Sequence, residues 1–242
     1  MNTSAQSRSG QEQRERLFFL GMALFITVTV ASAFGLFFKA GYSSFSAPWW
    51  VHLHAVSFMG WIGLYLTQNI FVYRDNLTYH RKLGRLGAVY AAWVILVGLV
   101  LTPVTLAVGR VPPFFTSAYF LALDWTNITV FAVLFYAAII NRKRTDWHRR
   151  LMLCATISLI APAWGRLIVL AGYMMTTLND VGALLGYVVI AMLADRLINK
   201  RVHPAYYWGA ATLVSMGIVI ELLSRVPLFV QLATMFAGQP PS

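Results

Sequence analysis

The stretch HRKLGRLGAVYAAWVILVGLVLTPVTLAV, from His80 to Val108, decides the fold class. Its first six residues include a histidine and three basic side chains, whereas residues 86–108 carry no charge. A helix of about 20 predominantly apolar residues is long enough to cross the hydrocarbon core of a bilayer. The stretch therefore predicts a transmembrane helix over residues 86–108 that starts directly after a basic segment.

Six other apolar runs have a similar length. They cover residues 17–38, 51–73, 117–140, 151–172, 181–198 and 206–228. The chain of 242 residues is 59% hydrophobic and 11% charged, which is more apolar than one soluble core could bury. We expect an all-α polytopic membrane protein, a seven-helix bundle that forms a single transmembrane domain over residues 17–238. A disordered N-terminal segment at 1–16 and a short tail at 239–242 would flank this domain.

The net charge of +11 is sorted between the loops. Most basic residues precede the first run or lie in the loops after the second, fourth and sixth runs; they are Arg8, Arg14, Arg16, Arg74, Arg81, Lys82, Arg85, Arg142, Lys143, Arg144, Arg149, Arg150, Arg196, Lys200 and Arg201. Basic residues next to membrane spans mark the cytoplasmic side. The pattern predicts a multi-pass protein of the bacterial inner membrane, with the N-terminus in the cytoplasm and the C-terminus outside. It argues against nucleic acid as a partner, since the charge reports topology.

The first run has a second interpretation as a signal peptide. A basic segment precedes it, and Ala31-Ser32-Ala33 has the small residues of a cleavage site. The run continues to Phe38, however, and the loop charges alternate correctly only if the run stays in place as a span. We therefore treat it as the first transmembrane helix.

Two histidines occupy equivalent places in the sequence. His80 opens HRKLGRLG and His148 opens HRRLMLCA, and both follow a charged loop and begin an apolar run. An antiparallel bundle would bring both to the cytoplasmic leaflet. The face of the helix below His80 carries Gly84 and Gly87, which would let a neighbouring helix or a flat macrocycle approach closely.

This pattern suggests a haem b site. Haem iron takes two axial nitrogens from opposite sides, and its propionates favour nearby arginines. His80 and His148 would be the iron ligands, and Arg81, Arg85 and Arg149 would hold the propionates. The alternative is structural: His-Arg at a cytoplasmic helix start also anchors topology, and a small-residue face also serves helix packing.

Ionisable residues in the opposite leaflet form a second candidate site. Asp124, Arg166 and Glu221 fall inside apolar runs, where charges are expensive and are functional candidates by default. His52 and His54 open the second run, and we expect His54 to face the bundle. Asp124 could neutralise Arg166, which would make these residues an ion-pair network that fixes helix register. The other interpretation is a polar pocket for a small substrate, a proton path or a metal ion.

Two segments carry a resemblance to known proteins. HLHAVSFMGWIGLYLTQNIFVYRDNLTYHRKLGRLG, at 52–87, and DWHRRLMLCATISLIAPAWGRL, at 146–167, resemble a group of bacterial integral-membrane proteins with HRxLGR and HRxxM segments but no firmly known activity. More distantly, the layout is similar to the transmembrane di-haem cytochrome b ferric reductases. That resemblance implies an inner haem on His80 and His148, and one outer ligand at His52 or His54. The second outer ligand of that class is missing near Phe120 to Asp124, so the resemblance implies one haem.

Three functions follow as hypotheses. The first is a b-type haem-binding electron-transfer protein, a membrane oxidoreductase that takes electrons from quinol or another redox partner. The second is a small transporter or ion-binding protein that works through the outer polar residues. The third is a non-catalytic subunit that packs against another membrane protein in the lipid bilayer.

Overall fold

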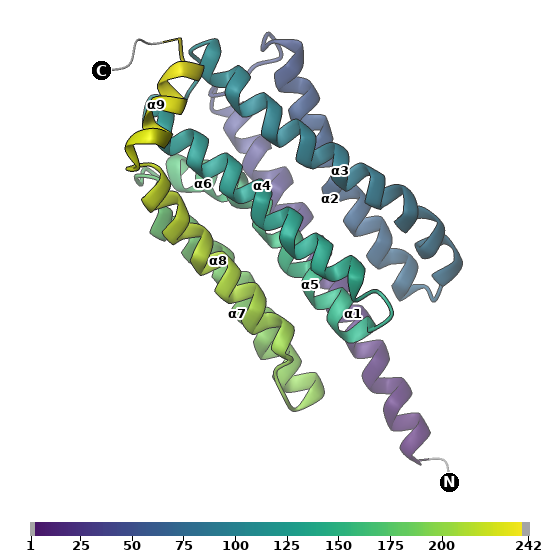
Figure 1. Cartoon of the computed structure of the whole chain (residues 1–242). Coiled ribbons are helices and arrows are strands. Elements are labelled where there is room, and N and C mark those ends of the chain that lie inside the picture. Colours follow the sequence, from purple (N-terminus) through teal and green to yellow (C-terminus); the bar gives the residue numbers. More distant parts are fainter. Residues whose placement is uncertain (1–2, 239–242) are drawn as a thin grey trace.

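A computed structural model describes residues 3–238, and side chains are described from residue 10 onward. The described part of the chain forms nine α-helices (Figure 1). They are α1 (Thr3–Lys39), α2 (Trp49–Tyr73), α3 (Leu77–Ala107), α4 (Ser117–Ile140), α5 (Thr145–Ser158), α6 (Ala161–Leu170), α7 (Thr177–Asn199), α8 (Pro204–Leu223) and α9 (Pro227–Phe236). The all-α fold predicted from the sequence is confirmed.

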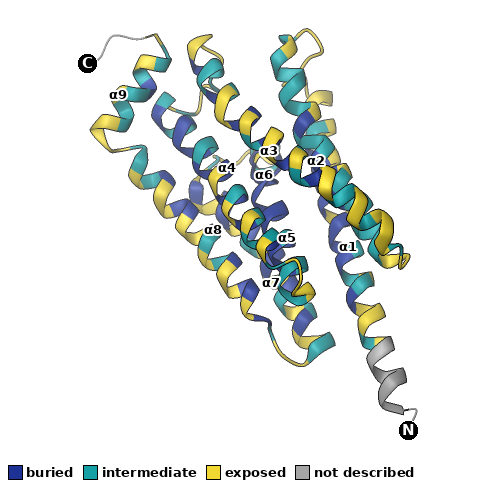
Figure 2. Cartoon of the chain, turned by 45° about the vertical axis from the view of Figure 1, so that its right-hand side comes forward, coloured by how far each residue is buried: buried dark blue, intermediate teal, exposed yellow. Residues whose placement is uncertain are grey.

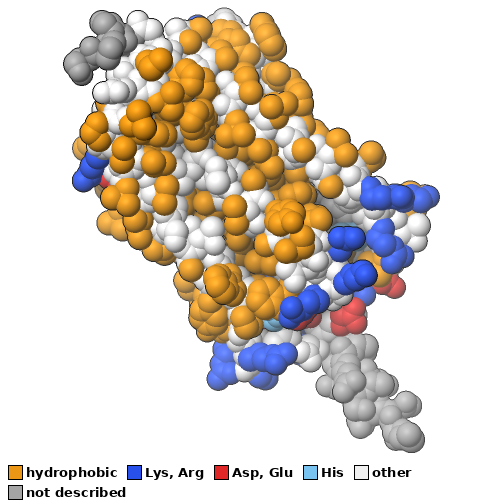
Figure 3. Space-filling view, in the orientation of Figure 1, with side chains coloured by type: hydrophobic (Ala, Val, Ile, Leu, Met, Phe, Trp, Pro, Cys, Tyr) orange, Lys and Arg blue, Asp and Glu red, His pale blue; other side chains and the backbone are white. Residues whose placement is uncertain are grey.

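Six of these helices are each long and apolar enough to cross a membrane: α1, α2, α3, α4, α7 and α8. The shorter helices α5 and α6 meet the same test together, although their axes bend by 43° at the break between them. Large hydrophobic side chains stay exposed along the outside of the bundle (Figures 2 and 3). Since lipid is the solvent that favours such a surface, the chain is a multi-pass membrane protein in contact with a bilayer.

Several helices begin at a residue whose side chain caps them. Asn76, Thr116 and Thr176 accept hydrogen bonds from backbone N–H groups in the first turns of α3, α4 and α7. His203 does the same for α8, where it accepts from the N–H of Ala205. Each cap satisfies a donor that the helix itself leaves free, and so it fixes where the chain turns back into the bundle.

The expected single span over 151–172 is broken. Helix α5 ends at Ser158 and α6 begins at Ala161. Pro162 lies in the first turn of α6, and its ring has no N–H with which to continue the hydrogen bonds of α5. The bend at this proline is therefore large enough to separate two helices.

The ends of the chain differ from the expectation. Residues 10–16, expected to be disordered, continue α1 as a helix, and Glu15 is buried against α5. The tail at 239–242 lies outside the described residues. The expected last run at 206–228 is divided: α8 ends at Leu223, and Pro227 starts the short helix α9, which packs its apolar face on α4 and α3.

The two ends of the bundle differ in charge. We call one the basic end: it holds the loops at 74–76, 141–144 and 200–203. Lysine and arginine side chains gather there in the space-filling view, while apolar side chains cover the middle of the bundle (Figure 3). The loops at 40–48, 108–116, 171–176 and 224–226 lie at the other end, which we call the opposite end.

Candidate functional site

His80 and His148 both lie at the basic end. Each is the fourth residue of its helix, His80 in α3 and His148 in α5. Both side chains are half-buried. The fold thus places at one end of the bundle two histidines that are 68 positions apart in the sequence.

The ring of His148 is held in one tautomer. Its Nδ1 lies 2.8 Å from the carbonyl oxygen of Ala138 on α4. A carbonyl oxygen can only accept, so Nδ1 donates, and Nε2 of the neutral ring keeps a free lone pair. Metal-binding histidines usually show this arrangement, in which the nitrogen that does not bind metal donates to a carbonyl or carboxylate.

The ring of His80 has a different partner, Gln68 on α2. With the Gln68 amide oxygen accepting from the N–H of Gly84 at 2.9 Å, the amide nitrogen donates to His80 Nδ1 at 2.5 Å. A neutral His80 ring then carries its proton on Nε2. Ligation through Nε2 therefore requires the Gln68 amide to turn, so that its oxygen accepts from Nδ1.

The small-residue face of α3 is covered by α2. A Cβ atom at Gly87 would lie 3.3 Å from Leu64, and one at Gly84 would lie 3.7 Å from Gln68. In this arrangement Gly84 and Gly87 serve helix packing, and the open slot for a macrocycle that the sequence suggested is filled by two side chains of α2.

The candidate propionate partners are not equivalent. Arg81 and Arg85 are exposed, and within the described residues neither forms a hydrogen bond or an ion pair. Arg149 instead pairs with Glu15 on α1 at 2.5 Å. The histidine pair therefore has two available cations beside it, and the third is already neutralised.

A buried polar network accounts for Arg149 and extends beyond it. Arg150 pairs with Glu15 at 3.1 Å and also with Asp195 on α7. Asn199 donates to both of these carboxylates, at 2.6 and 2.7 Å. The cation that pairs with Asp195 thus lies on another helix, α5. The network joins α1, α5 and α7 at the basic end.

At the opposite end, the residues of the expected polar site lie in separate groups. His54 on α2 and Arg166 on α6 line a cavity of about 60 Å³. The His54 ring stacks on Phe58 with 4.4 Å between ring centres. The Arg166 guanidinium lies 4.1 Å from the centre of the Phe34 ring and donates to the carbonyl of Pro162.

The predicted neutralisation of Arg166 by Asp124 is not a direct ion pair. Among the described residues no carboxylate oxygen lies within 4.0 Å of Arg166, and Asp124 accepts a hydrogen bond from Thr102 at 3.1 Å. His52 bonds only to the carbonyl of Phe45, at 3.2 Å. Because the partners of Asp124 and Arg166 come from different helices, spacing in the sequence could not identify them.

Glu221 belongs to a third group of side chains. It pairs with Arg225 at 2.7 Å, as a spacing of four residues on one helix allows. Thr177 on α7 donates to the other oxygen of Glu221 at 2.6 Å, and Tyr119 on α4 lies 2.5 Å from the Thr177 hydroxyl. Asp180, one turn after Thr177, is 2% exposed.

Sequence reasoning missed Tyr119, Thr177 and Asp180. The expected span began at residue 181, so Asp180 was assigned to a loop. The signal that could have placed it was Thr176, whose side chain caps α7 and puts the start of the helix at Thr177.

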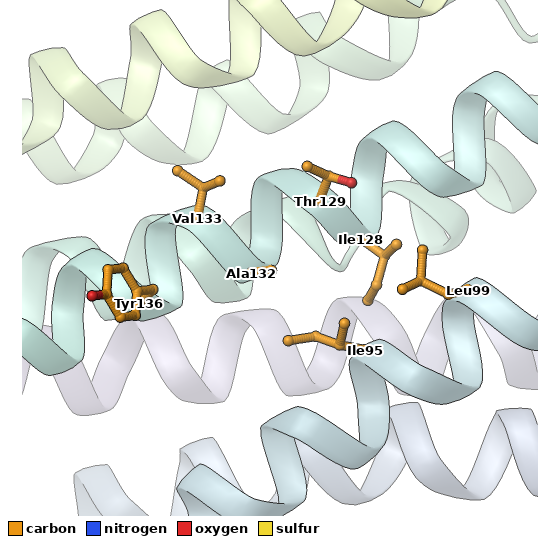
Figure 4. A pocket seen from close by; sticks show the side chains of 7 residues that line it. All are labelled: Ile95, Leu99, Ile128, Thr129, Ala132, Val133 and Tyr136. Atoms are coloured by element: carbon orange, nitrogen blue, oxygen red, sulfur yellow. The ribbon is translucent and has the colours of Figure 1, made fainter.

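An apolar groove lies away from these polar groups. It is formed between α3 and α4, has a volume of about 330 Å³ and carries only apolar side chains apart from Thr129 and Tyr136 (Figure 4). Its lining residues are Ile95, Leu99, Ile128, Thr129, Ala132, Val133 and Tyr136. This chemistry suits a lipid chain better than a polar substrate.

Comparison with known proteins adds no functional assignment. The chain matches no protein-family model, and neither the curated proteins nor the solved structures gave a significant match. The resemblances noted in the sequence therefore stay predictions, and the geometry of the histidine pair and of the polar groups carries the functional argument.

Proposed function

We propose that the protein is a b-type haem-binding electron-transfer protein of the bacterial inner membrane, with His80 and His148 as the iron ligands. The observation that carries this proposal is the bond from His148 Nδ1 to the Ala138 carbonyl, which leaves Nε2 free at the end of the bundle that also holds His80. A bound haem b would supply one-electron redox chemistry. Quinol or a cytoplasmic reductant is the proposed electron donor.

The chain's own residues have defined tasks in this proposal. Ala138 holds the orientation of His148, and Gln68 turns its amide so that its oxygen accepts from His80 Nδ1. Arg81 and Arg85 are the available cations for the propionates. The covered face at Gly84 and Gly87 does not fit a haem as it stands, so Gln68 and Leu64 must move when the group binds.

The test is the reduced-minus-oxidised absorption spectrum of the detergent-purified protein, expressed with ample haem. Wild type is compared with His80→Ala and His148→Ala. His52→Ala is the matched control, because His52 is a half-buried histidine at the opposite end that bonds only to a loop carbonyl. We expect a b-type spectrum in wild type and control that both site variants lose. A featureless wild-type spectrum would overturn the proposal, as would a spectrum that both site variants retain.

We further propose that the bent pair α5–α6 forms one transmembrane span, so that the protein crosses the membrane seven times. We also propose that the basic end faces the cytoplasm. Single cysteines at Lys143 and Tyr173, in a Cys154→Ala background, flank the bent pair, and Tyr173 is an exposed loop residue. A membrane-impermeant maleimide applied to intact cells should label Tyr173→Cys and leave Lys143→Cys unlabelled until the cells are opened. The reverse pattern would refute the orientation, and labelling of both positions in intact cells would refute the single span formed by α5 and α6.

A further inference from the structure

Asp180 is a carboxylic acid without a partner inside the bundle. Its side chain is almost completely buried on α7, and its Oδ1 has no hydrogen-bond partner among the described residues. No described lysine, arginine or histidine nitrogen lies within 4.0 Å of its carboxylate. An isolated ionised carboxylate in an apolar interior carries a large desolvation cost. Such a group requires a proton or a cation.

The hydroxyl groups beside Asp180 are ordered by Glu221. Thr177 donates its proton to Glu221, so the Thr177 oxygen is left to accept from the hydroxyl of Tyr119. Arg225 donates to the second oxygen of Glu221 at 2.7 Å. Both Asp180 and Glu221 are near enough to act on Tyr119 electrostatically. These bonds require an ionised Glu221, and Arg225 neutralises its charge.

The charged groups around Asp180 thus leave its carboxylate without a counter-ion. Tyr119 on α4 and Glu221 with Arg225 on α8 are the ionisable groups beside it. Helices α1, α5 and α6 also pack on α7, but their buried ionisable groups bond elsewhere: Glu15 to Arg149 and Arg150, Arg150 to Asp195, and Arg166 to Pro162. One negative charge remains uncompensated.

The hydrogen-bonded residues Tyr119, Thr177, Glu221 and Arg225 also reach the surface. The Glu221 side chain is 41% exposed and that of Arg225 is 77% exposed, at the end of α8. Thr177 lies between Glu221 and the turn of α7 that holds Asp180. A path of oxygen atoms thus leads from the opposite end of the bundle toward the buried carboxyl.

We propose that Asp180 is a proton-binding site that exchanges with the compartment at the opposite end through Thr177 and Glu221. One proton converts the Asp180 carboxylate to a neutral carboxylic acid and removes its uncompensated charge. A metal ion is the weaker candidate, because no group of three or more His, Cys, Asp or Glu residues in the described part of the chain could hold one. This site is independent of the histidine pair at the basic end.

The test is the infrared spectrum of the detergent-purified full chain, since only a protonated carboxyl group shows the carbonyl stretch of a carboxylic acid. Wild type, Asp180→Asn and the control Asp124→Asn are compared. Asp124 is the control because it is a half-buried carboxyl in an apolar helix that, unlike Asp180 Oδ1, accepts a hydrogen bond, from Thr102. We expect the band in wild type and in Asp124→Asn, and its loss in Asp180→Asn. A wild-type protein without the band would overturn the proposal, as would Asp180→Asn that keeps it.

Two further measurements keep the test decisive. Wild type labelled with ¹³C-aspartate should show the band at lower frequency, which assigns it to an aspartate even if Asp180→Asn fails to fold; an unshifted band would refute the assignment. Titration of the band in sodium chloride and in choline chloride should give the same midpoint. A midpoint that shifts with sodium would show that Asp180 binds a metal cation instead of a proton, and would overturn the proposal.

Discussion

Arg150 on α5 forms an ion pair with Asp195 on α7, and both side chains are 3% exposed. The same guanidinium reaches Glu15 on α1, so that three helices meet at one buried cation. A buried pair of this kind gains little over a well-packed apolar pair, but the loss of one member leaves the other charge buried alone. The loss of one charged residue from this network therefore costs more stability than the intact network adds.

Replacing Arg150 by alanine should destabilise the protein strongly. The change leaves the Asp195 carboxylate buried without its cation, and the expected cost is about 3–5 kcal/mol. Thermal unfolding in detergent measures it. The control is Arg225→Ala, which removes an exposed pair and should cost no more than about 1 kcal/mol. Equal unfolding temperatures for the two variants would contradict the buried role of Arg150.

Gly209 should not tolerate alanine. A Cβ atom there would lie 2.4 Å from the Cys154 sulfur and 2.9 Å from its Cβ, so α8 would have to move away from α5. Overpacking of this kind costs about 1–3 kcal/mol. Gly186→Ala on α7 is the matched control, because a Cβ at Gly186 meets nothing within 4 Å and alanine favours a helix.

Unfolding temperatures of the two glycine variants decide this prediction. Gly209→Ala should melt below wild type and Gly186→Ala at or above it. If both variants melt alike, α5 and α8 are not in close contact at Cys154.

His203 should make stability depend on pH. Its Nδ1 accepts from Ala205 and its Nε2 donates to Asp146 at 3.0 Å, which is the pattern of a neutral ring. Burial lowers the pKa of His203, although the hydrogen bond to Asp146 opposes this shift. The unfolded chain then binds more protons below about pH 6.5, so stability falls as the pH drops through that range.

The variant His203→Asn can still cap α8 but does not titrate. The change in unfolding temperature between about pH 7.5 and about pH 5.5 should therefore be smaller in this variant than in wild type. An identical change in the two proteins would show that other groups set the acid sensitivity.

The sequence predicts contacts along one helix better than contacts between helices. The pair of Glu221 and Arg225 follows from a spacing of four residues, and the structure contains it. The proposed neutralisation of Arg166 by Asp124 required the rotation of two separate helices about their axes. The periodicity of apolar residues in the sequence does not specify how each helix is rotated about its axis. In the structure, Arg166 lies over an aromatic ring of α1 and not beside Asp124.

Helix ends were the other source of error. The spans were assigned from apolar runs alone, so the first turns of α7 and α1 were taken as loop or disordered chain. Asp180 and Glu15 lie in those turns, and both are polar residues buried by tertiary packing. A hydropathy pattern excludes such residues from a span. The all-α bundle was predictable because its apolar runs are long and uninterrupted.

The position of Glu15 also has a consequence for biogenesis. Its partners Arg149 and Arg150 follow 134 and 135 residues later in the chain. During synthesis α1 therefore enters the bilayer long before the cations that neutralise this carboxylate leave the ribosome. Contacts of such high sequence separation close late, because the intervening chain must first be ordered. Assembly at the basic end is completed only when α7 follows α5 and its Asp195 and Asn199 join the network with Arg150 and Glu15.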